Sequence, residues 1–137
     1  MTRMMPHEGD RHERTWMAWP TAGYTLGDTA ADAEEARSTW AAVAHAVARF
    51  EPVTMVVDPS EAATARGALG SEIELLEAPL DDAWMRDIGP TFVRDGDGLA
   101  AVDWMFNGWG AQDWASWEHD QHIGAAVAAA AGVERID

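Results

Sequence analysis

The ten residues from 81 to 90, DDAWMRDIGP, combine carboxylates with an indole in a way that suits the binding of a cation. Asp87 offers a carboxylate that can pair with a planar guanidinium, and Trp84 offers an aromatic face on which such a cation can stack. We expect Arg86 to point away from Asp87 and to fix the loop by pairing with an acid or a carbonyl. Because the segment follows a predicted strand, it lies where ligand sites of α/β proteins commonly form.

A purely structural explanation of the same residues stays open. In that alternative, Asp82 and Arg86 form a surface ion pair while Trp84 packs into the core. The tryptophans leave a similar choice, because aromatic walls line cation sites and sugar sites but also fill cores. Trp109 and Trp114, in a segment rich in glycine and polar residues, fit either environment equally well.

The histidines do not indicate a metal site. His119 and His122 are three residues apart on a predicted helix with Asp120 between them, but no further ligand cluster accompanies them. The sequence DGDG at 95–98 lacks the later ligands of a calcium loop, so it predicts a turn. We therefore expect no metal.

The composition narrows the classes of partner. The net charge is −15, with 24 acids against nine basic residues, all of them arginine. Nucleic acids and anionic membranes are poor partners for such a chain, whereas a small cation would be attracted. No apolar run approaches the roughly 18 residues of a membrane helix, and the start of the chain has no apolar signal segment. The absence of cysteine fits a cytoplasmic protein and removes any thiolate nucleophile.

The predicted strands and helices alternate, which is typical of an α/β protein with partly parallel pairing. We expect a single domain, residues 1–137, with two strand–helix–strand units near 53–78 and 99–136. The strands are predicted at 15–19, 53–57, 72–78, 91–95, 99–106 and 133–136. Because the last of these has nothing after it to pair with or cover it, the chain looks cut partway through an architecture.

Capping residues and apolar spacing locate the helices. Thr29, followed by Asp32, should cap a long helix that ends before Pro52. Its core face is predicted from residues at helical spacing, namely Ala36, Trp40, Val43, Val47 and Phe50. Ser60 should cap a second helix that ends at Gly70, and a third helix should run from 117 to 131 and close at Gly132.

Three segments in order resemble the signatures of the agmatine deiminase family, which includes bacterial peptidyl-arginine deiminases. They are PHEGDRHERTWMAWP, DDAWMRDIGPTFV and VDWMFNGWG, and the resemblance covers essentially the whole chain. It implies part of the pentein fold, an α/β-propeller of five ββαβ-type repeats, of which this chain would supply about the first two. It also implies hydrolysis of a guanidine by a cysteine thiolate, with a histidine shuttling protons and no cofactor. The reaction would convert agmatine to N-carbamoylputrescine and ammonia, or arginine side chains to citrulline.

Residue by residue, the resemblance makes Asp87 the catalytic aspartate that binds the guanidinium and Trp84 the tryptophan beside the substrate. Arg86, Asn107 and Trp109 are expected to support the loops. Because the chain has no cysteine, we expect it to be inactive alone, as the amino-terminal part of a deiminase. Agmatine is preferred to protein arginine as the substrate, and homo-oligomerisation is left open. A noncatalytic module that binds a cation or a sugar through the tryptophan loop, and a truncated product that does not fold stably, are the alternatives.

Overall fold

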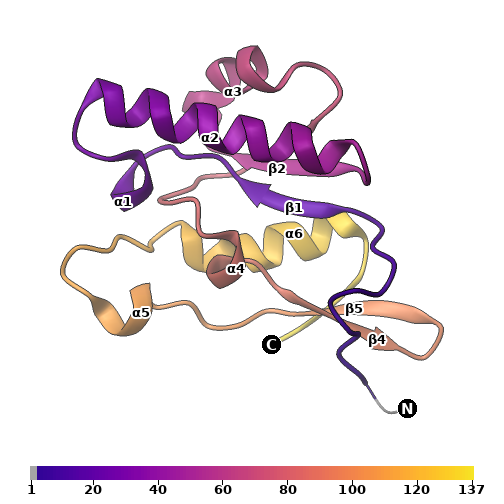
Figure 1. Ribbon diagram of the computed structural model, residues 1–137. Coiled ribbons are helices and arrows are strands. Elements are labelled where there is room, and N and C mark those ends of the chain that lie inside the picture. Colours follow the sequence, from indigo (N-terminus) through magenta and orange to yellow (C-terminus); the bar gives the residue numbers. More distant parts are fainter. Residues whose placement is uncertain (1–2) are drawn as a thin grey trace.

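In the computed structural model, which describes residues 3–137, six strands form two three-stranded sheets (Figure 1). The first sheet is parallel throughout, in the order β1 (Thr15–Ala18), β2 (Val53–Val57) and β3 (Glu74–Glu77). In the second sheet the central strand is β5 (Gly98–Val102), which pairs antiparallel with β4 (Thr91–Asp95) and parallel with β6 (Glu134–Ile136). The two predicted strand–helix–strand units are therefore confirmed, and the last strand does have a partner.

Helices connect the parallel strands. α2 (Ala30–Ala48) lies between β1 and β2, and α3 (Ala62–Leu69) follows a 3-10 turn, η1 (Pro59–Glu61), and leads to β3. α6 (Ile123–Ala131) follows a second 3-10 turn, η2 (Asp120–His122), and leads to β6. The remaining helices are single turns within loops: α1 (Gly23–Leu26), α4 (Met85–Ile88) and α5 (Gly108–Ala111).

The helix ends follow from local chemistry, as predicted. The Thr29 hydroxyl accepts a hydrogen bond from the Asp32 backbone N–H at 3.1 Å, and the Asp32 carboxylate accepts one from the Thr29 N–H at 3.0 Å. This reciprocal pair satisfies two N–H groups that the first helical turn would otherwise leave without partners. At the other end of the chain, Gly132 closes α6 with a φ of 68°, a conformation that glycine adopts without steric cost.

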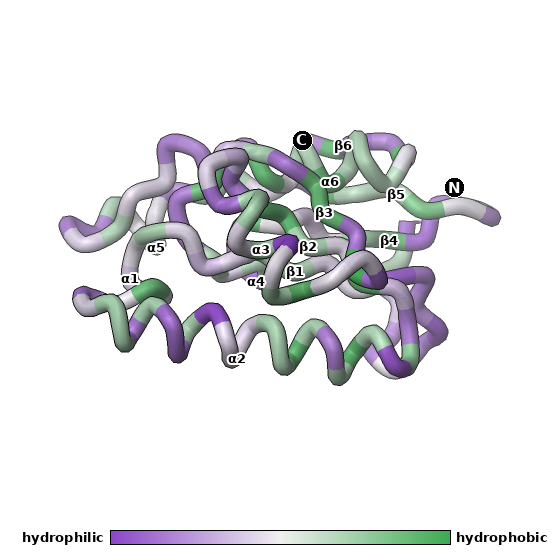
Figure 2. The backbone as a smooth tube through the Cα atoms, turned by 90° about the horizontal axis from the view of Figure 1, so that it is seen from above, coloured by the Kyte–Doolittle hydropathy of each residue, from purple (hydrophilic) through white to green (hydrophobic). Residues whose placement is uncertain are grey.

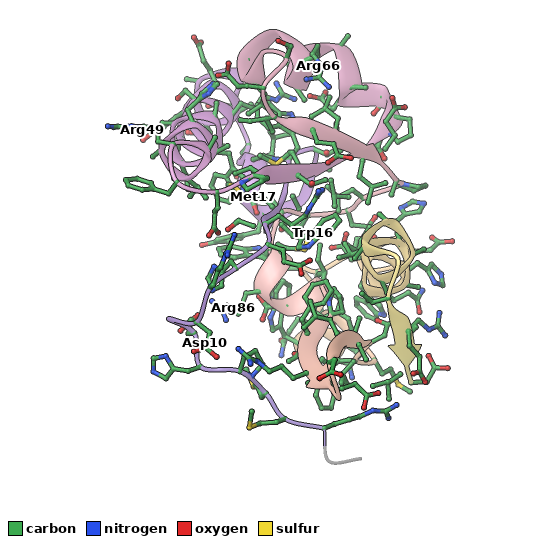
Figure 3. All side chains as sticks on the ribbon, turned by 90° about the vertical axis from the view of Figure 1, so that its right-hand side faces the viewer. Asp10, Trp16, Met17, Arg49, Arg66 and Arg86 are labelled. Carbon is green, nitrogen blue, oxygen red and sulfur yellow. The ribbon has the colours of Figure 1, made fainter. Side chains whose placement is uncertain are left out.

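Two apolar clusters lie on the two faces of the first sheet. α2 and α3 cover one face, where Met17 of β1 and Met55 of β2 point. The opposite face, with Trp16 and Val56, packs against α4 and α6, which fill the space toward the second sheet. Trp16 and Met17 are labelled on β1 in Figure 3. Because both faces of β2 are covered, its five residues are all buried, which explains why all of them except Thr54 are apolar.

The core face of α2 is predicted only in part, because Trp40 and Val47 pack against the core but two other predicted residues do not. Val43 is 48 % exposed and Phe50, which lies beyond the end of the helix, is 85 % exposed, whereas Ala41 and Ala44 are buried. Hydrophilic and hydrophobic residues alternate along this helix (Figure 2), so the sequence does not mark a single row of apolar residues as the core face. The face toward the sheet combines the buried alanines with the partly buried Trp40 and Val47.

Three predicted boundaries are also corrected. Asp58 rather than Ser60 caps the turn before α3, accepting a hydrogen bond from the Ser60 N–H at 2.9 Å. The helix predicted from 117 begins only at Asp120 as a 3-10 turn, because Trp117 packs into the second cluster instead. The strand predicted to 106 ends at Val102.

None of the helices within residues 3–137 is both long enough and apolar enough to cross a membrane.

Candidate functional site

An open cavity of about 820 Å³ lies where the three single-turn helices meet. Its lining consists of one carboxylate and four aromatic side chains, from Tyr24, Trp84, Asp87, Trp109 and Trp114. Figure 1 shows α1 and α5 at the left of the molecule, one above the other, and α4 nearer its middle, below the tip of β1. Three of the predicted site residues therefore come together, although their segments are separated in the sequence.

Asp87 lies on α4 with an exposed carboxylate. Its Oδ1 accepts a hydrogen bond from the indole Nε1–H of Trp109 at 3.2 Å. Within residues 3–137 no other side chain donates to this carboxylate, so Oδ2 keeps its capacity to accept. The turn that carries Asp87 ends at Gly89, where a β-carbon would lie 2.8 Å from the carbonyl oxygen of Met85. Glycine is therefore required for the chain to leave this turn so tightly.

Trp84 precedes this turn and is 37 % exposed at the cavity. Its indole Nε1–H donates to Oδ2 of Asp82 at 3.2 Å. The alternative with Trp84 in the core and an Asp82–Arg86 ion pair is wrong, because Asp82 is buried and Arg86 pairs elsewhere. An aromatic ring held by its polar edge leaves the rest of its surface for contact with a ligand.

Arg86 does not line the cavity and instead connects α4 to the start of the chain. Its guanidinium donates to Oε1 of Glu8 at 2.9 Å, and this contact lowers the pKa of the Glu8 carboxyl. Arg86 is labelled in Figure 3, beside the N-terminal segment that also carries Asp10. Both partners of the pair are exposed, so solvent screens it and it contributes little to stability.

The aromatic wall is built from residues of two loops. The rings of Trp109 and Trp114 stack with centroids 5.2 Å apart, and Phe106 meets Trp109 edge-on at 5.0 Å. On the far side, Tyr24 of α1 lies 5.9 Å from Trp114. The two loop tryptophans, for which sequence alone allowed a core or a site, thus both line the cavity.

Asn107 and two glycines shape the loop that presents Trp109. The Asn107 side-chain oxygen accepts a hydrogen bond from the Gly110 N–H at 2.9 Å and closes the turn of α5. At Gly108, which has a φ of 64°, a β-carbon would lie 2.2 Å from the ring of Trp117. Trp109 itself has a φ of 56°, a left-handed conformation that is unusual for a bulky residue. Backbone strain of this kind is commonly found at functional sites.

A network of acids beneath the cavity was not predicted from the sequence. Asp120 is 1 % exposed, and its carboxylate accepts hydrogen bonds from the N–H groups of Asp81 at 2.7 Å and Asp82 at 3.1 Å. Asp81 in turn accepts from the N–H groups of His119 at 2.7 Å and Asp120 at 3.2 Å. The loop at Asp81–Asp82 and the turn at His119–Asp120 therefore each supply a carboxylate that accepts from the backbone of the other. The only signal in the sequence was the unexplained pair of acids at 81 and 82.

Burial and hydrogen bonds shift the pKa values of the titratable groups in this network. Burial raises the pKa of Asp120 to about 6, with smaller contributions in the same direction from the charges of Asp81 and Asp82. Burial would also raise the pKa of Asp81, but hydrogen bonds from His119 hold it below its ordinary value. The His119 ring lies 3.0 Å from Asp81, and that hydrogen bond raises the pKa of His119. Among residues 3–137 no cluster of three such side chains is arranged to hold a metal.

The geometry suits the binding of a flat cation. A carboxylate with a free oxygen lies next to indole rings in a chain of net charge −15. Electrostatic attraction, hydrogen bonding and cation–π contact would all act on a guanidinium placed there.

Comparison with known proteins connects this geometry to a family. The sequence profile of the Porphyromonas-type peptidyl-arginine deiminases matches residues 4–137. A Streptomyces coelicolor protein named "putative agmatine deiminase" is 64 % identical over 129 residues, covering 93 % of this chain and 38 % of its own length. The agmatine deiminase of Stutzerimonas stutzeri is 44 % identical over 128 residues, covering 90 % of this chain and 34 % of its own length.

The fold is similar to solved structures of the same group. The structure of an agmatine deiminase from Enterococcus faecalis, described as catalysing its reaction, matches 98 % of this chain and 38 % of its own with a TM-score of 0.88 at 30 % identity. The architecture is thus α/β and forms part of a pentein fold. The chain spans a little over a third of the length of the relatives that it matches.

Proposed function

The chain belongs to the Porphyromonas-type peptidyl-arginine deiminase family, and we propose from this membership that it forms the guanidinium-binding wall of a guanidine-deiminating hydrolase. The proposed substrate is agmatine, which would be converted to N-carbamoylputrescine and ammonia. This choice follows the two relatives described above, which carry the names "putative agmatine deiminase" and "agmatine deiminase". Protein arginine is the alternative within the same family.

The observation that supports the proposal is the place of Asp87 in the aromatic cavity. A guanidinium presents paired N–H groups in one plane, and a carboxylate can accept two of them in parallel. The hydrogen bond from Trp109 fixes the orientation of the Asp87 carboxylate before the ligand arrives. Trp84 would then cover the face of the cation, so that the guanidinium carbon is held in one position for attack.

The covalent step needs a group that this sequence does not contain. In the proposed reaction a thiolate attacks the guanidinium carbon and ammonia departs, which leaves an amidino-thioether. Water then attacks the same carbon, the ureido product leaves and the thiolate is freed. The chain has no cysteine, so its own residues would bind and orient the guanidinium without catalysing its hydrolysis. We expect the 137-residue chain to bind agmatine and to release no ammonia from it.

The test is a titration with agmatine, followed by tryptophan fluorescence and by calorimetry. Putrescine is the matched ligand control, because it has the same four-carbon chain and terminal amine but carries a second amine in place of the guanidinium. Agmatine should bind and putrescine should not. The Asp87→Asn variant should lose roughly tenfold or more in affinity, since one charge-assisted contact is removed. Equal binding of the two ligands, or an unchanged affinity in Asp87→Asn, would contradict the proposal.

Three further ligands separate the alternatives. N-acetyl-arginine amide, which mimics an arginine in a peptide, should bind more weakly than agmatine if the small substrate is correct. A noncatalytic module is favoured by the combination of an aromatic cavity with the absence of cysteine. Such a module would bind tetramethylammonium or a sugar as well as agmatine, because its selectivity would not depend on N–H groups in the ligand.

A further inference from the structure

Asp82 is a buried acid that lies behind the cavity rather than in its lining. It is 6 % exposed, yet no cation pairs with it among the described residues. Its carboxylate is surrounded by hydrogen-bond donors instead. They are the backbone N–H groups of Tyr24, Thr25 and Ala83, the hydroxyl of Thr25 and the indole N–H of Trp84.

Each of the two carboxylate oxygens of Asp82 accepts hydrogen bonds from groups on both segments. Oδ2 accepts from the Tyr24 N–H at 3.1 Å and from the Trp84 indole at 3.2 Å. Oδ1 accepts from the Thr25 N–H at 3.3 Å, from the Thr25 hydroxyl and from the Ala83 N–H at 2.8 Å. A carboxylate accepts hydrogen bonds on both oxygens and can therefore face both sets of donors, whereas the amide of asparagine accepts on one side only.

One carboxylate thereby joins two walls of the cavity that are 60 residues apart in sequence. Tyr24 belongs to α1 and Trp84 precedes α4, and both side chains line the cavity. Gly23 permits the approach of α1, because a β-carbon there would lie 2.8 Å from Oδ2 of Asp82. We propose that Asp82 is a positioning residue of the guanidine site, which locks Tyr24 and Trp84 into one fixed wall.

The backbone at Asp82 is fixed in turn by the buried carboxylate of Asp120. The N–H of Asp82 donates to the buried carboxylate of Asp120 at 3.1 Å, and the N–H of Asp81 donates to the same group at 2.7 Å. The backbone at Asp82 therefore cannot move without breaking contacts to η2. A wall held in this way before the ligand arrives loses little conformational freedom on binding, which improves affinity.

The inference rests on the proposed guanidine site, but its first test does not need a ligand. In Asp82→Asn the amide nitrogen would face either the donors on Oδ2 or those on Oδ1, so at least one wall is released. By NMR, the indole Nε1–H of Trp84 and the amide N–H groups of Tyr24 and Thr25 should shift and broaden. Asp97→Asn is the matched control, because it makes the same charge change in the exposed β4–β5 turn.

A second variant keeps the inference testable if Asp82→Asn does not fold. Thr25→Val removes one donor to Oδ1, retains the carboxylate and changes the shape of the side chain little. It should move the Trp84 indole and Tyr24 amide resonances by a smaller amount. Unchanged Trp84 and Tyr24 resonances in a folded Asp82→Asn, or in Thr25→Val if that alone folds, would overturn the inference.

The second test is binding. Asp82→Asn should weaken agmatine affinity by about tenfold, while Asp97→Asn should leave it unchanged. If the wild-type chain binds no agmatine at all, the proposed function fails, and the NMR comparison still decides whether Asp82 positions the wall. If the wild type binds agmatine and a folded Asp82→Asn binds it equally well, the positioning role is wrong although the proposed function stands.

Discussion

Replacing Asp120 by asparagine should change how the stability of the protein depends on pH. Burial raises the pKa of Asp120 from an ordinary 3.8 to about 6, so the folded protein holds this proton more tightly than the unfolded chain. The stabilisation is therefore fully present below about pH 3.8 and is lost as the pH rises through about 6. The difference between the two pKa values, at about 1.4 kcal/mol per pH unit, corresponds to about 3 kcal/mol.

The comparison between wild type and Asp120→Asn isolates this contribution. Asparagine keeps a carbonyl oxygen that can accept from the N–H groups of Asp81 and Asp82, but it does not titrate. Other acids, such as Glu51, have lowered pKa values and act in the opposite direction, but the two proteins share most of this effect. Relative to the variant, wild type should thus lose about 3 kcal/mol between pH 4 and pH 7.

Urea unfolding followed by tryptophan fluorescence measures the free energy of unfolding at each pH. The difference between the two proteins should change steadily over the interval from about pH 4 to about pH 6 and be constant above it. A ¹³C NMR titration of the Asp120 carboxyl in wild type provides an independent value of the same pKa. If the stability difference does not depend on pH, the reasoning that burial outweighs the hydrogen bonds at Asp120 is refuted.

Three further predictions concern the supports of the site and the core. Gly108→Ala should lower the melting temperature measured by circular dichroism by several degrees, because its β-carbon would lie 2.2 Å from the Trp117 ring; an unchanged melt would contradict the close contact. Leu69→Ala should cost about 2–5 kcal/mol in urea unfolding, since Leu69 is fully buried; a loss below about 1 kcal/mol would show a loosely packed core. An NMR titration should give His119 a pKa above 6.5, and Asp81→Asn should return it toward that value; the stabilisation from this pair should be lost as the pH rises through the pKa of His119.

Local chemistry made much of the fold predictable. Thr29 and Asp32 cap α2 through contacts within four residues, and Gly132 closes α6 by a backbone conformation that glycine favours. Such signals depend only on near neighbours, so the sequence contains them completely. Whether Val43 or Ala44 faces the core could not be predicted in this way, because each is an apolar residue at helical spacing from other apolar residues. Only the distance between α2 and the sheet decides it, and that distance is a tertiary property.

The candidate site shows the same division. The sequence suggests that Asp87 lies beside an aromatic ring, since Trp84 precedes it by three residues in the same short loop. The neighbour that donates to Asp87 is Trp109, 22 residues further along the chain. The participation of Tyr24 could not be predicted either, because its loop reaches the cavity through a carboxylate 58 residues away. Contacts over such separations leave no periodic pattern in the sequence.

The three acids of the loop at 81–87 have different surroundings, and the difference indicates which of them is available to a ligand. Asp81 and Asp82 are each surrounded by several donors of the protein, which offset the cost of removing a carboxylate from water. Asp87 accepts from a single donor, remains exposed and faces a cavity of aromatic rings. A carboxylate so oriented, with one oxygen unused, gains most from a ligand that brings paired N–H groups. We therefore propose that the guanidinium binds Asp87, and that Asp81 and Asp82 support the loop that carries it.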